Sequence, residues 1–357
     1  MKLITPKSSI KQHDINEKIQ NRTVLAVGKQ AVSRFAGLKC GIVGAGGLGI
    51  IVAELLARLG VKYIAIIDYD SVDYSNLNRF LSATNIDAQL NTPKTTVAAR
   101  LIASINPSIE VDIVNGDFLE NNNQECFKSC DFIFGSSDSV GVRLAINHLC
   151  LANGTGYFDL GCGVKTESGK MTAAGGQIIK ITPSSGFCIN CCGMFDINKA
   201  YIDFVDPDES ARQRAMGYVD GENLPQASVY ALNMMVASQA VWLMMRLVAG
   251  EKLDFDGVYI DALTLKSYPW SEKIKRQERK ENPCIVCGDS GIEFSGDDAG
   301  LLERESVKNE FIPENTFQRK SENRIKPKVD SAHYGKPNKQ IEWDVRIILD
   351  SAVMKTY

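Results

Sequence analysis

A glycine-rich run near the start of the chain carries the clearest chemical signal. Within six positions it contains four glycines: Gly44, Gly46, Gly47 and Gly49. A short apolar stretch, residues 40–44, leads into the run, and an apolar helical pattern, residues 48–59, follows it. Glycines between a buried strand and a helix let the backbone turn tightly and approach a phosphate, while the start of the helix directs free N–H groups at the anion. The pattern predicts a nucleotide-binding turn.

Polar residues cluster just after the next predicted strand, residues 63–67. Asp68 lies 19 residues after the last of the glycines, and at this spacing an acidic side chain can bind ribose hydroxyls. Asp70, Asn76 and Arg79 follow within the next eleven positions. The combination of acidic, amide and guanidinium groups predicts contacts to the phosphates of ATP.

A lone match to this glycine pattern arises easily by chance, and a dehydrogenase would share it. In this chain the strand, turn, helix, second strand and acidic residue occur in register. The amide and guanidinium groups after the second strand, together with Lys94, would have no role in a nicotinamide site. We therefore favour an ATP site over a dinucleotide site.

The elements that must position these groups alternate between strand and helix up to about residue 164. Such alternation predicts an α/β fold, a doubly wound, Rossmann-like and mainly parallel sheet with helices on both faces. Besides the segments named above, strands are expected at 111–114, 132–135, 157–162, 176–182 and 257–260, the last two of open direction. Helices are expected at 140–152, ending at Gly154, and at 48–59, ending at Gly60.

A long apolar segment, residues 227–248, has the length of a membrane-spanning helix. It carries Asn233, Gln239 and Arg246, and polar groups in hydrocarbon are costly. We interpret it as a buried core helix. The chain is 357 residues long, 44% hydrophobic, with a formal net charge of −3. This composition predicts a cytoplasmic globular protein with no nucleic-acid or membrane partner, and the first residues do not form a signal peptide.

The composition divides the chain into three parts. Residues 1–35 are predicted to form an N-terminal helical arm, and residues 36–290 a single nucleotide-binding domain. Within that domain, residues 193–225 are polar and irregular and are expected to form a long crossover loop. Residues 291–357 are rich in charged residues, Asn, Ser and Pro, and are expected to form a partly flexible extension.

Two CxxC pairs stand out among the ten cysteines. The pairs are Cys188 with Cys191 and Cys284 with Cys287. Four thiolates in two such pairs predict a tetrahedral structural zinc ion, which would staple the crossover loop to the end of the domain. The alternative is a set of free buried cysteines.

These motifs together resemble the ThiF/MoeB/HesA family, whose adenylation domain is shared with ubiquitin-activating enzymes. The resemblance covers roughly residues 20–290. It rests on the GAGGLG turn, the DYDSVDYSNLNR block, TPK, INP, SSD and the two CxxC pairs.

The resemblance implies a role for each polar residue of the site. Asp68 would bind the ribose, and Asn76, Arg79 and Lys94 would contact phosphates. Asp138 would hold Mg²⁺, which suits its hard carboxylate at the end of the predicted strand 132–135. The structural alternatives are surface ion pairs for Arg79 and Lys94 and a helix N-cap for Asp138.

The family also implies the reaction and the partners. Members use ATP to adenylate the C-terminal glycine of a ubiquitin-like or sulfur-carrier protein and release pyrophosphate. The alternatives are adenylation of a short peptide or a non-catalytic subunit of a paired activating enzyme. Members work as homodimers or paired repeats, and an N-terminal arginine reaches the neighbouring site; Arg22 and Arg34 are the candidates here.

The step after adenylation depends on the remaining cysteines. A thioester needs an exposed thiolate with a lowered pKa close to the adenylate. The expected crossover loop contains no cysteine, which leaves Cys192, beside the first CxxC pair, and Cys162, near the end of a predicted strand. We expect the adenylate to pass directly to an external acceptor, such as a conjugating-enzyme cysteine, a persulfide or an amine.

Overall fold

The computed structural model describes most of the first 271 residues and a few beyond them. The described residues are 12–120, 122–183, 185–192, 195, 200–204, 227–271, 284, 286–288 and 295–296. Most of the expected crossover loop and nearly all of the expected C-terminal extension lie outside this set, so those two predictions are not addressed by the structure.

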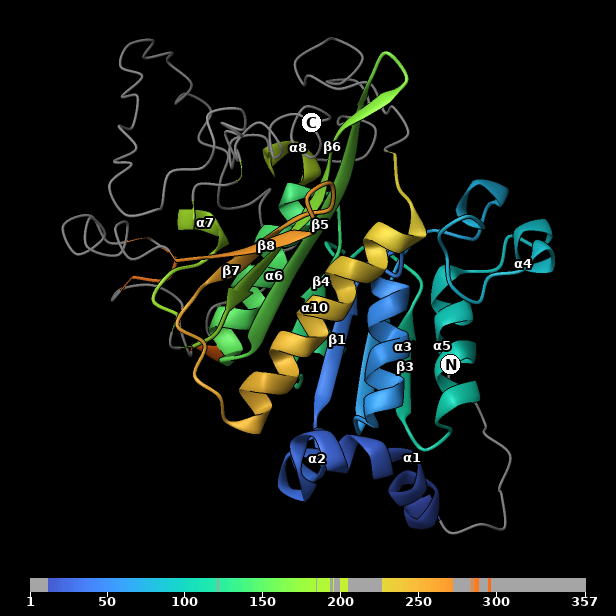
Figure 1. Cartoon of the computed structure of the whole chain (residues 1–357), viewed down its shortest axis with the longest axis vertical. Coiled ribbons are helices and arrows are strands. Elements are labelled where there is room, and N and C mark those ends of the chain that lie inside the picture. Colours follow the sequence, from blue (N-terminus) through green and yellow to red (C-terminus); the bar gives the residue numbers. More distant parts are fainter. Residues whose placement is uncertain are drawn as a thin grey trace.

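A single sheet of eight strands organises the molecule (Figure 1). Its order is β3-β2-β1-β4-β5-β6-β7-β8; pairing is parallel from β3 to β5 and antiparallel from β5 to β8. The strands are β1 Lys39–Val43, β2 Tyr63–Ile67, β3 Glu110–Val114, β4 Phe132–Gly135, β5 Gly156–Glu167, β6 Lys170–Ile181, β7 Gly257–Asp261 and β8 Lys266–Trp270.

Helices cover both faces of the sheet, as Figure 1 shows. α3, α5 and α10 pack on one face and α6 on the other, with α1 and α2 at the end where β1 begins. The described helices are α1 Gln12–Val27, α2 Lys29–Phe35, α3 Gly49–Leu59, α4 Asn85–Gln89, α5 Lys94–Ile105, α6 Val140–Asn153, α7 Ile189–Cys192, α8 Tyr201–Phe204 and α10 Tyr230–Ala249. Short 3₁₀ turns occupy Tyr74–Asn76 and Glu125–Phe127.

Alternation along the strands creates a separate core on each face. In β2, Ile64 and Ile66 belong to the core under α3 and α10, whereas Ala65 and Ile67 belong to the core under α6. Because successive side chains of a strand point to opposite faces, a strand buried on both sides reads as a continuous apolar run. This arrangement confirms the predicted doubly wound α/β fold.

Glycines end the two helices that frame the site. α3 ends at Gly60 (φ 76°) and α6 at Gly154 (φ 67°), both in the left-handed conformation that glycine adopts without strain. Both helix ends lie where the sequence predicts them.

The second half of the sheet differs from the prediction, because its two hairpin strands are longer than expected. β5 and β6 are twelve residues each, longer than the expected 157–162 and 176–182. Ser168 and Gly169, both with positive φ (49° and 75°), make the two-residue turn that suits the twist of a hairpin. Polar residues in the outer half of both strands had obscured the strand pattern there, and β8 was not predicted at all.

α10 is the one helix among the described residues that is long and apolar enough to cross a membrane. Its buried side chains include Leu232, Val236 and Val241, which belong to the core shared with α3 and the sheet. This packing is that of a core helix.

Candidate active site

The glycine turn is a close steric fit between β1 and α3. Gly44 has φ 90° and its amide donates to the carbonyl of Ile67 on β2 (3.0 Å). A Cβ on Gly49 would overlap the carbonyl oxygen of Gly44, so only glycine lets the helix start this close to the strand. By contrast, among the described residues other than the immediate neighbours of Gly46, no atom lies within 4 Å of the position that a Cβ on Gly46 would take. The turn therefore has a packed side and an open side.

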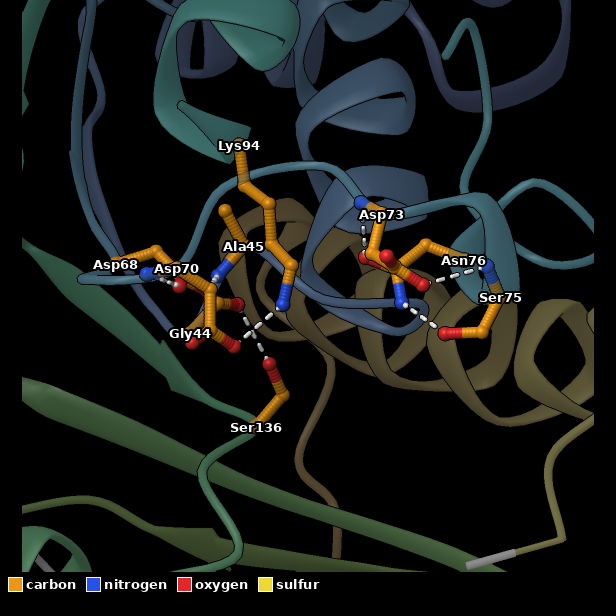
Figure 2. A network of polar contacts seen from close by, with 9 residues as sticks. All are labelled: Gly44, Ala45, Asp68, Asp70, Asp73, Ser75, Asn76, Lys94 and Ser136. Carbon is orange, nitrogen blue, oxygen red and sulfur yellow. Dashed lines mark hydrogen bonds and ion pairs between the residues drawn. The ribbon is translucent and has the colours of Figure 1, made fainter. Parts of the chain in front are cut away.

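Asp68 braces this turn from the end of β2 (Figure 2). Its carboxylate accepts hydrogen bonds from the backbone amides of Ala45 (2.7 Å) and Asp70 (2.8 Å). Partial burial raises the pKa of Asp68 above its usual value, and the nearby charge of Lys94 opposes that rise. The residue predicted to bind ribose thus also holds the turn in shape.

Lys94, the first residue of α5, reaches the same place. Its Nζ lies 2.6 Å from a carboxylate oxygen of Asp70, and its backbone amide donates to the Asp70 carbonyl (3.0 Å). A cation at a helix N-terminus opposes the helix dipole, and the Asp70 carboxylate compensates it. Lys94 is therefore held beside the turn as an ion pair, and its contact with phosphate stays a prediction.

Asn76 and Arg79 follow on the segment after β2. Asn76 Oδ1 accepts from the Asp73 amide (3.2 Å), which is part of the capping box of a 3₁₀ turn (Figure 2). Asn76 Nδ2 also donates to Ser75 Oγ (3.4 Å). Arg79 donates to the Ser75 carbonyl (2.7 Å), and its Cγ lies 3.6 Å from the Cβ position of Gly47. Of the two, the structure places Arg79 directly against the glycine turn.

Asp138 is exposed on the segment between β4 and α6. The N-cap of α6 is Ser139, whose Oγ accepts from the Val142 amide (3.0 Å). The structural alternative, Asp138 as the cap, is therefore wrong. Among the described residues, no hydrogen bond or ion pair engages the Asp138 carboxylate, which leaves its oxygens available to a cation.

A pocket of about 130 Å³ joins the segment after β4 and the middle of β5 to the glycine turn and to the start of α10. In parallel sheets the edge at the carboxyl ends of the strands, at the point where the strand order reverses, is where ligands bind. The pocket is lined by Gly47, Leu48, Ser136, Ser137, Asp138, Arg143, Leu160, Gly161, Cys162, Ala227, Ser228 and Asn233.

Sequence reasoning missed two buried polar residues of this pocket. Arg143 on α6 forms an ion pair with Asp159 on β5 (2.7 Å), and both side chains are almost fully buried. Burial raises the pKa of Asp159, while the Arg143 charge and the Tyr157 hydroxyl, which donates to it at 3.0 Å, counter the shift. Asn233 on α10 sits so close to Gly47 that a side chain at position 47 would collide with its amide nitrogen. Each of the two is a polar residue within an otherwise apolar helix, and this was the feature of the sequence that could have indicated a pocket residue.

The segment after α7 also meets the start of α6. Asp203, on α8, accepts from Ser139 Oγ and from the Gly141 amide, both at 2.9 Å. The ring of Phe195 lies 4.9 Å from the Arg143 guanidinium carbon. Two described positions of the expected crossover loop therefore contact the helix that follows Asp138.

The four predicted zinc ligands come together. The Sγ–Sγ distances are 3.8 Å for Cys188–Cys191, 4.0 Å for Cys188–Cys284 and 3.7 Å for Cys191–Cys287, and all four sulfurs lie within 4.8 Å of one another. Four thiolates around one zinc at about 2.3 Å are about 3.8 Å apart. The cluster is therefore compatible with a tetrahedral zinc ion.

Neither remaining candidate thiol has the surroundings of a nucleophile. Cys192 is fully buried, and its Sγ donates to the Ile189 carbonyl (3.2 Å). Cys162 donates to Asn233 Oδ1 (3.0 Å), and burial raises the pKa of Cys162 to about 11. A thiol with a raised pKa carries little thiolate at neutral pH.

Comparisons with known proteins agree on one family. The model of the ThiF family matches residues 20–286. The SAMP-activating enzyme E1 of Haloferax volcanii is 27% identical over 270 residues, which are 75% of this chain and 86% of that enzyme. Ubiquitin-like modifier-activating enzyme 5 of Dictyostelium discoideum is 30% identical over 162 residues, 42% of this chain and 40% of that protein. The chain thus matches less than half the length of this second relative.

Solved structures share the fold. A crystal structure of E. coli MccB with ATP superposes with a TM-score of 0.56 at 17% identity, over 76% of this chain and 74% of that one. At this identity the likeness supports the architecture described above.

An added methyl group is expected to lower the stability of the fold on one side of the glycine turn and the affinity for ATP on the other. We expect Gly49→Ala to lower the free energy of unfolding by about 3 kcal/mol, because its Cβ would overlap the Gly44 carbonyl. We expect Gly46→Ala to unfold like the wild type but to bind ATP roughly tenfold more weakly, because its Cβ occupies the open side. Chemical denaturation and calorimetric ATP titration measure both. Wild-type ATP affinity in Gly46→Ala would show that no phosphate approaches there.

The cysteine cluster predicts about one bound zinc ion per chain. We expect Cys284→Ser to lose the zinc and to lower the thermal unfolding midpoint, because structural zinc contributes folding free energy directly. Cys192→Ser is the matched control and should keep the metal, since Cys192 is outside the cluster. Elemental analysis and thermal melts test this. A stable, metal-free wild-type protein would contradict it.

Proposed function

The chain belongs to the ThiF family, and from this premise we propose that it is an ATP-dependent adenylyltransferase. The observation that supports this most is that the glycine turn and Asp138 line one pocket, while Arg79 lies against Gly47 of the same turn. The proposed substrate is a carboxylate at the C-terminus of a ubiquitin-like or sulfur-carrier protein. The name of the Dictyostelium relative indicates a ubiquitin-like modifier as its partner.

In the proposed reaction, a carboxylate oxygen of the substrate attacks the α-phosphorus of ATP. A new C(O)–O–P bond forms, the bond between that phosphorus and the bridging oxygen breaks, and pyrophosphate leaves. Two anions must come together, so positive charge and oriented N–H groups have to offset their repulsion. The amides of the glycine turn, Arg79 and Lys94 supply both. Lys94 would leave Asp70 for the phosphates when ATP binds.

Asp138 is the proposed ligand of Mg²⁺. Its carboxylate is exposed, lines the pocket and is not needed as a helix cap. A bound Mg²⁺ would neutralise phosphate charge. Asp138 would hold that charge in the pocket that Gly47 of the glycine turn also lines.

Two alternatives concern the acyl substrate and the catalytic role. A short peptide would use the same pocket, because only its terminal carboxylate reacts. A non-catalytic subunit of a paired enzyme would not need Arg79, Lys94 and Asp138 together, so we place it last. After adenylation, the buried state of Cys192 and the raised pKa of Cys162 favour direct transfer to an external acceptor, such as a conjugating enzyme.

We further propose a homodimer in which Arg22 reaches the neighbouring site. Arg34, the other candidate, donates to the Val248 carbonyl at the end of α10 (2.9 Å). That contact occupies its guanidinium within its own chain. Arg22 is exposed on α1.

ATP–pyrophosphate exchange tests the reaction. We expect exchange with a ubiquitin-like or sulfur-carrier protein ending in Gly-Gly, and none when its terminal glycine is deleted. Asp138→Asn should lower exchange at least about a hundredfold, because the metal loses its ligand. The matched control is Asp254→Asn, an exposed carboxylate just before β7, which should exchange like the wild type. Normal exchange in Asp138→Asn would refute the metal assignment. If the wild-type protein shows no exchange with any carrier protein or peptide, the proposed function is refuted.

Complementation tests the dimer. Arg22→Ala and Asp138→Asn should each be inactive alone, yet a 1:1 mixture should recover about a quarter of wild-type exchange, because half of the pairs are mixed and one site in each is intact. Light scattering should give the mass of a dimer. A monomer with full activity would contradict the proposal.

A further inference from the structure

Gln177, on β6, is a buried carboxamide that no group of the protein satisfies. The residue is 2% exposed, and neither Nε2 nor Oε1 has a hydrogen-bond partner among the described residues. Buried polar groups in folded proteins are nearly always paired, so an exception calls for a ligand or a bound water.

The position of Gln177 puts this carboxamide beside the pocket. In the β5–β6 pairing Gln177 faces Gly161, which lines the pocket and has no side chain. The point where a Cβ on Gly161 would lie is 3.7 Å from Gln177 Nε2 and 3.8 Å from Arg143 Nη2. A carboxamide and a guanidinium thus flank the same point on the α6 side of the sheet.

The geometry points to a subsite for the backbone of the acyl substrate: we propose that the Gln177 carboxamide pairs with the N–H and C=O of one extended residue just before the reacting carboxylate. In an extended chain both groups of one residue point to the same side. A primary carboxamide offers one acceptor and a donor in matching positions. Gly161, which lines the pocket, places no side chain between the pocket and Gln177. This inference rests on the proposed function, because it assumes a substrate with a peptide backbone.

A labelled octapeptide of mixed sequence ending in Gly-Gly, with a free carboxylate, serves as the probe. Fluorescence anisotropy measures its binding to the full chain with Mg²⁺ and α,β-methylene-ATP, so that no reaction occurs. Gln177→Met has nearly the same shape without polar atoms, and Gln177→Leu is the second variant should the first fold poorly. We expect about tenfold weaker binding, the worth of one hydrogen-bonding group.

Backbone chemistry supplies the decisive comparison. Three probes carry a single N-methyl group on each of the last three peptide bonds in turn. One of them should bind the wild type about tenfold more weakly than the unmodified probe does. The same two probes should bind Gln177→Met equally, because that substitution has already removed the hydrogen bond that the N-methyl group blocks. The variant should also melt no lower than the wild type, since no internal bond is lost.

Gln20→Met is the matched control. Gln20 is 5% exposed and also has an unpaired Oε1, but its Nε2 donates to the Arg58 carbonyl (2.7 Å), at the opposite end of α3 from the glycine turn. We expect wild-type peptide binding there.

Three results would overturn the subsite: peptide affinity unchanged in Gln177→Met, no N-methyl position coupled to Gln177, or no binding of the probe to the wild type. The outcome is separable from that of the proposed function. Pyrophosphate exchange without coupling to Gln177 would reject the subsite alone, and coupling without exchange would reject the adenylation alone.

Discussion

The close approach of Gly49 to the Gly44 carbonyl is the constraint on which the site depends. It lets α3 begin directly against the end of β1. Two neighbouring strands then attach to the same few backbone atoms, because Asp68 after β2 accepts from the Ala45 amide and Ser136 after β4 donates to the Gly44 carbonyl (2.7 Å). Three strand ends thus meet at one turn, and the described part of the chain leaves space beside Gly46 on its open side. The pocket that Asp138 and Arg143 line lies against the same turn, at Gly47 and Leu48.

The parts of the fold that local pattern controls could be predicted from the sequence. Buried strands appear as short apolar runs, and α3 and α6 end at Gly60 and Gly154 because those positions need a left-handed backbone. The cysteine cluster was predictable for a similar reason, since CxxC spacing itself positions two thiolates on one metal. Strand ends also revealed Asp68 and Asp138, because parallel strands bring their carboxyl ends to one edge.

Contacts made by distant segments could not be predicted in the same way. Asn233, Arg143 and Gln177 lie within apolar helices or strands, and nothing local distinguishes a core polar residue from a pocket residue. Their roles depend on the pairing of β5 with β6 and on the packing of α10 against the glycine turn. The N-cap of α6 shows that the sequence pattern also does not decide between two neighbouring residues. Two adjacent residues suit an N-cap, and the backbone dihedrals select Ser139 over Asp138.

The contact of Asp203 with the start of α6 makes the expected crossover loop part of the electrostatics of the site. Its carboxylate accepts hydrogen bonds from Ser139 Oγ and from the Gly141 amide, one and three residues beyond Asp138. An anion that binds at this helix end must compete with Asp203, and displacement of the segment removes a negative charge from beside Asp138. The two events are thermodynamically linked. A ligand that must displace Asp203 binds more weakly by the free energy of that displacement. By reciprocity, it binds more tightly by the same free energy when the segment has already moved.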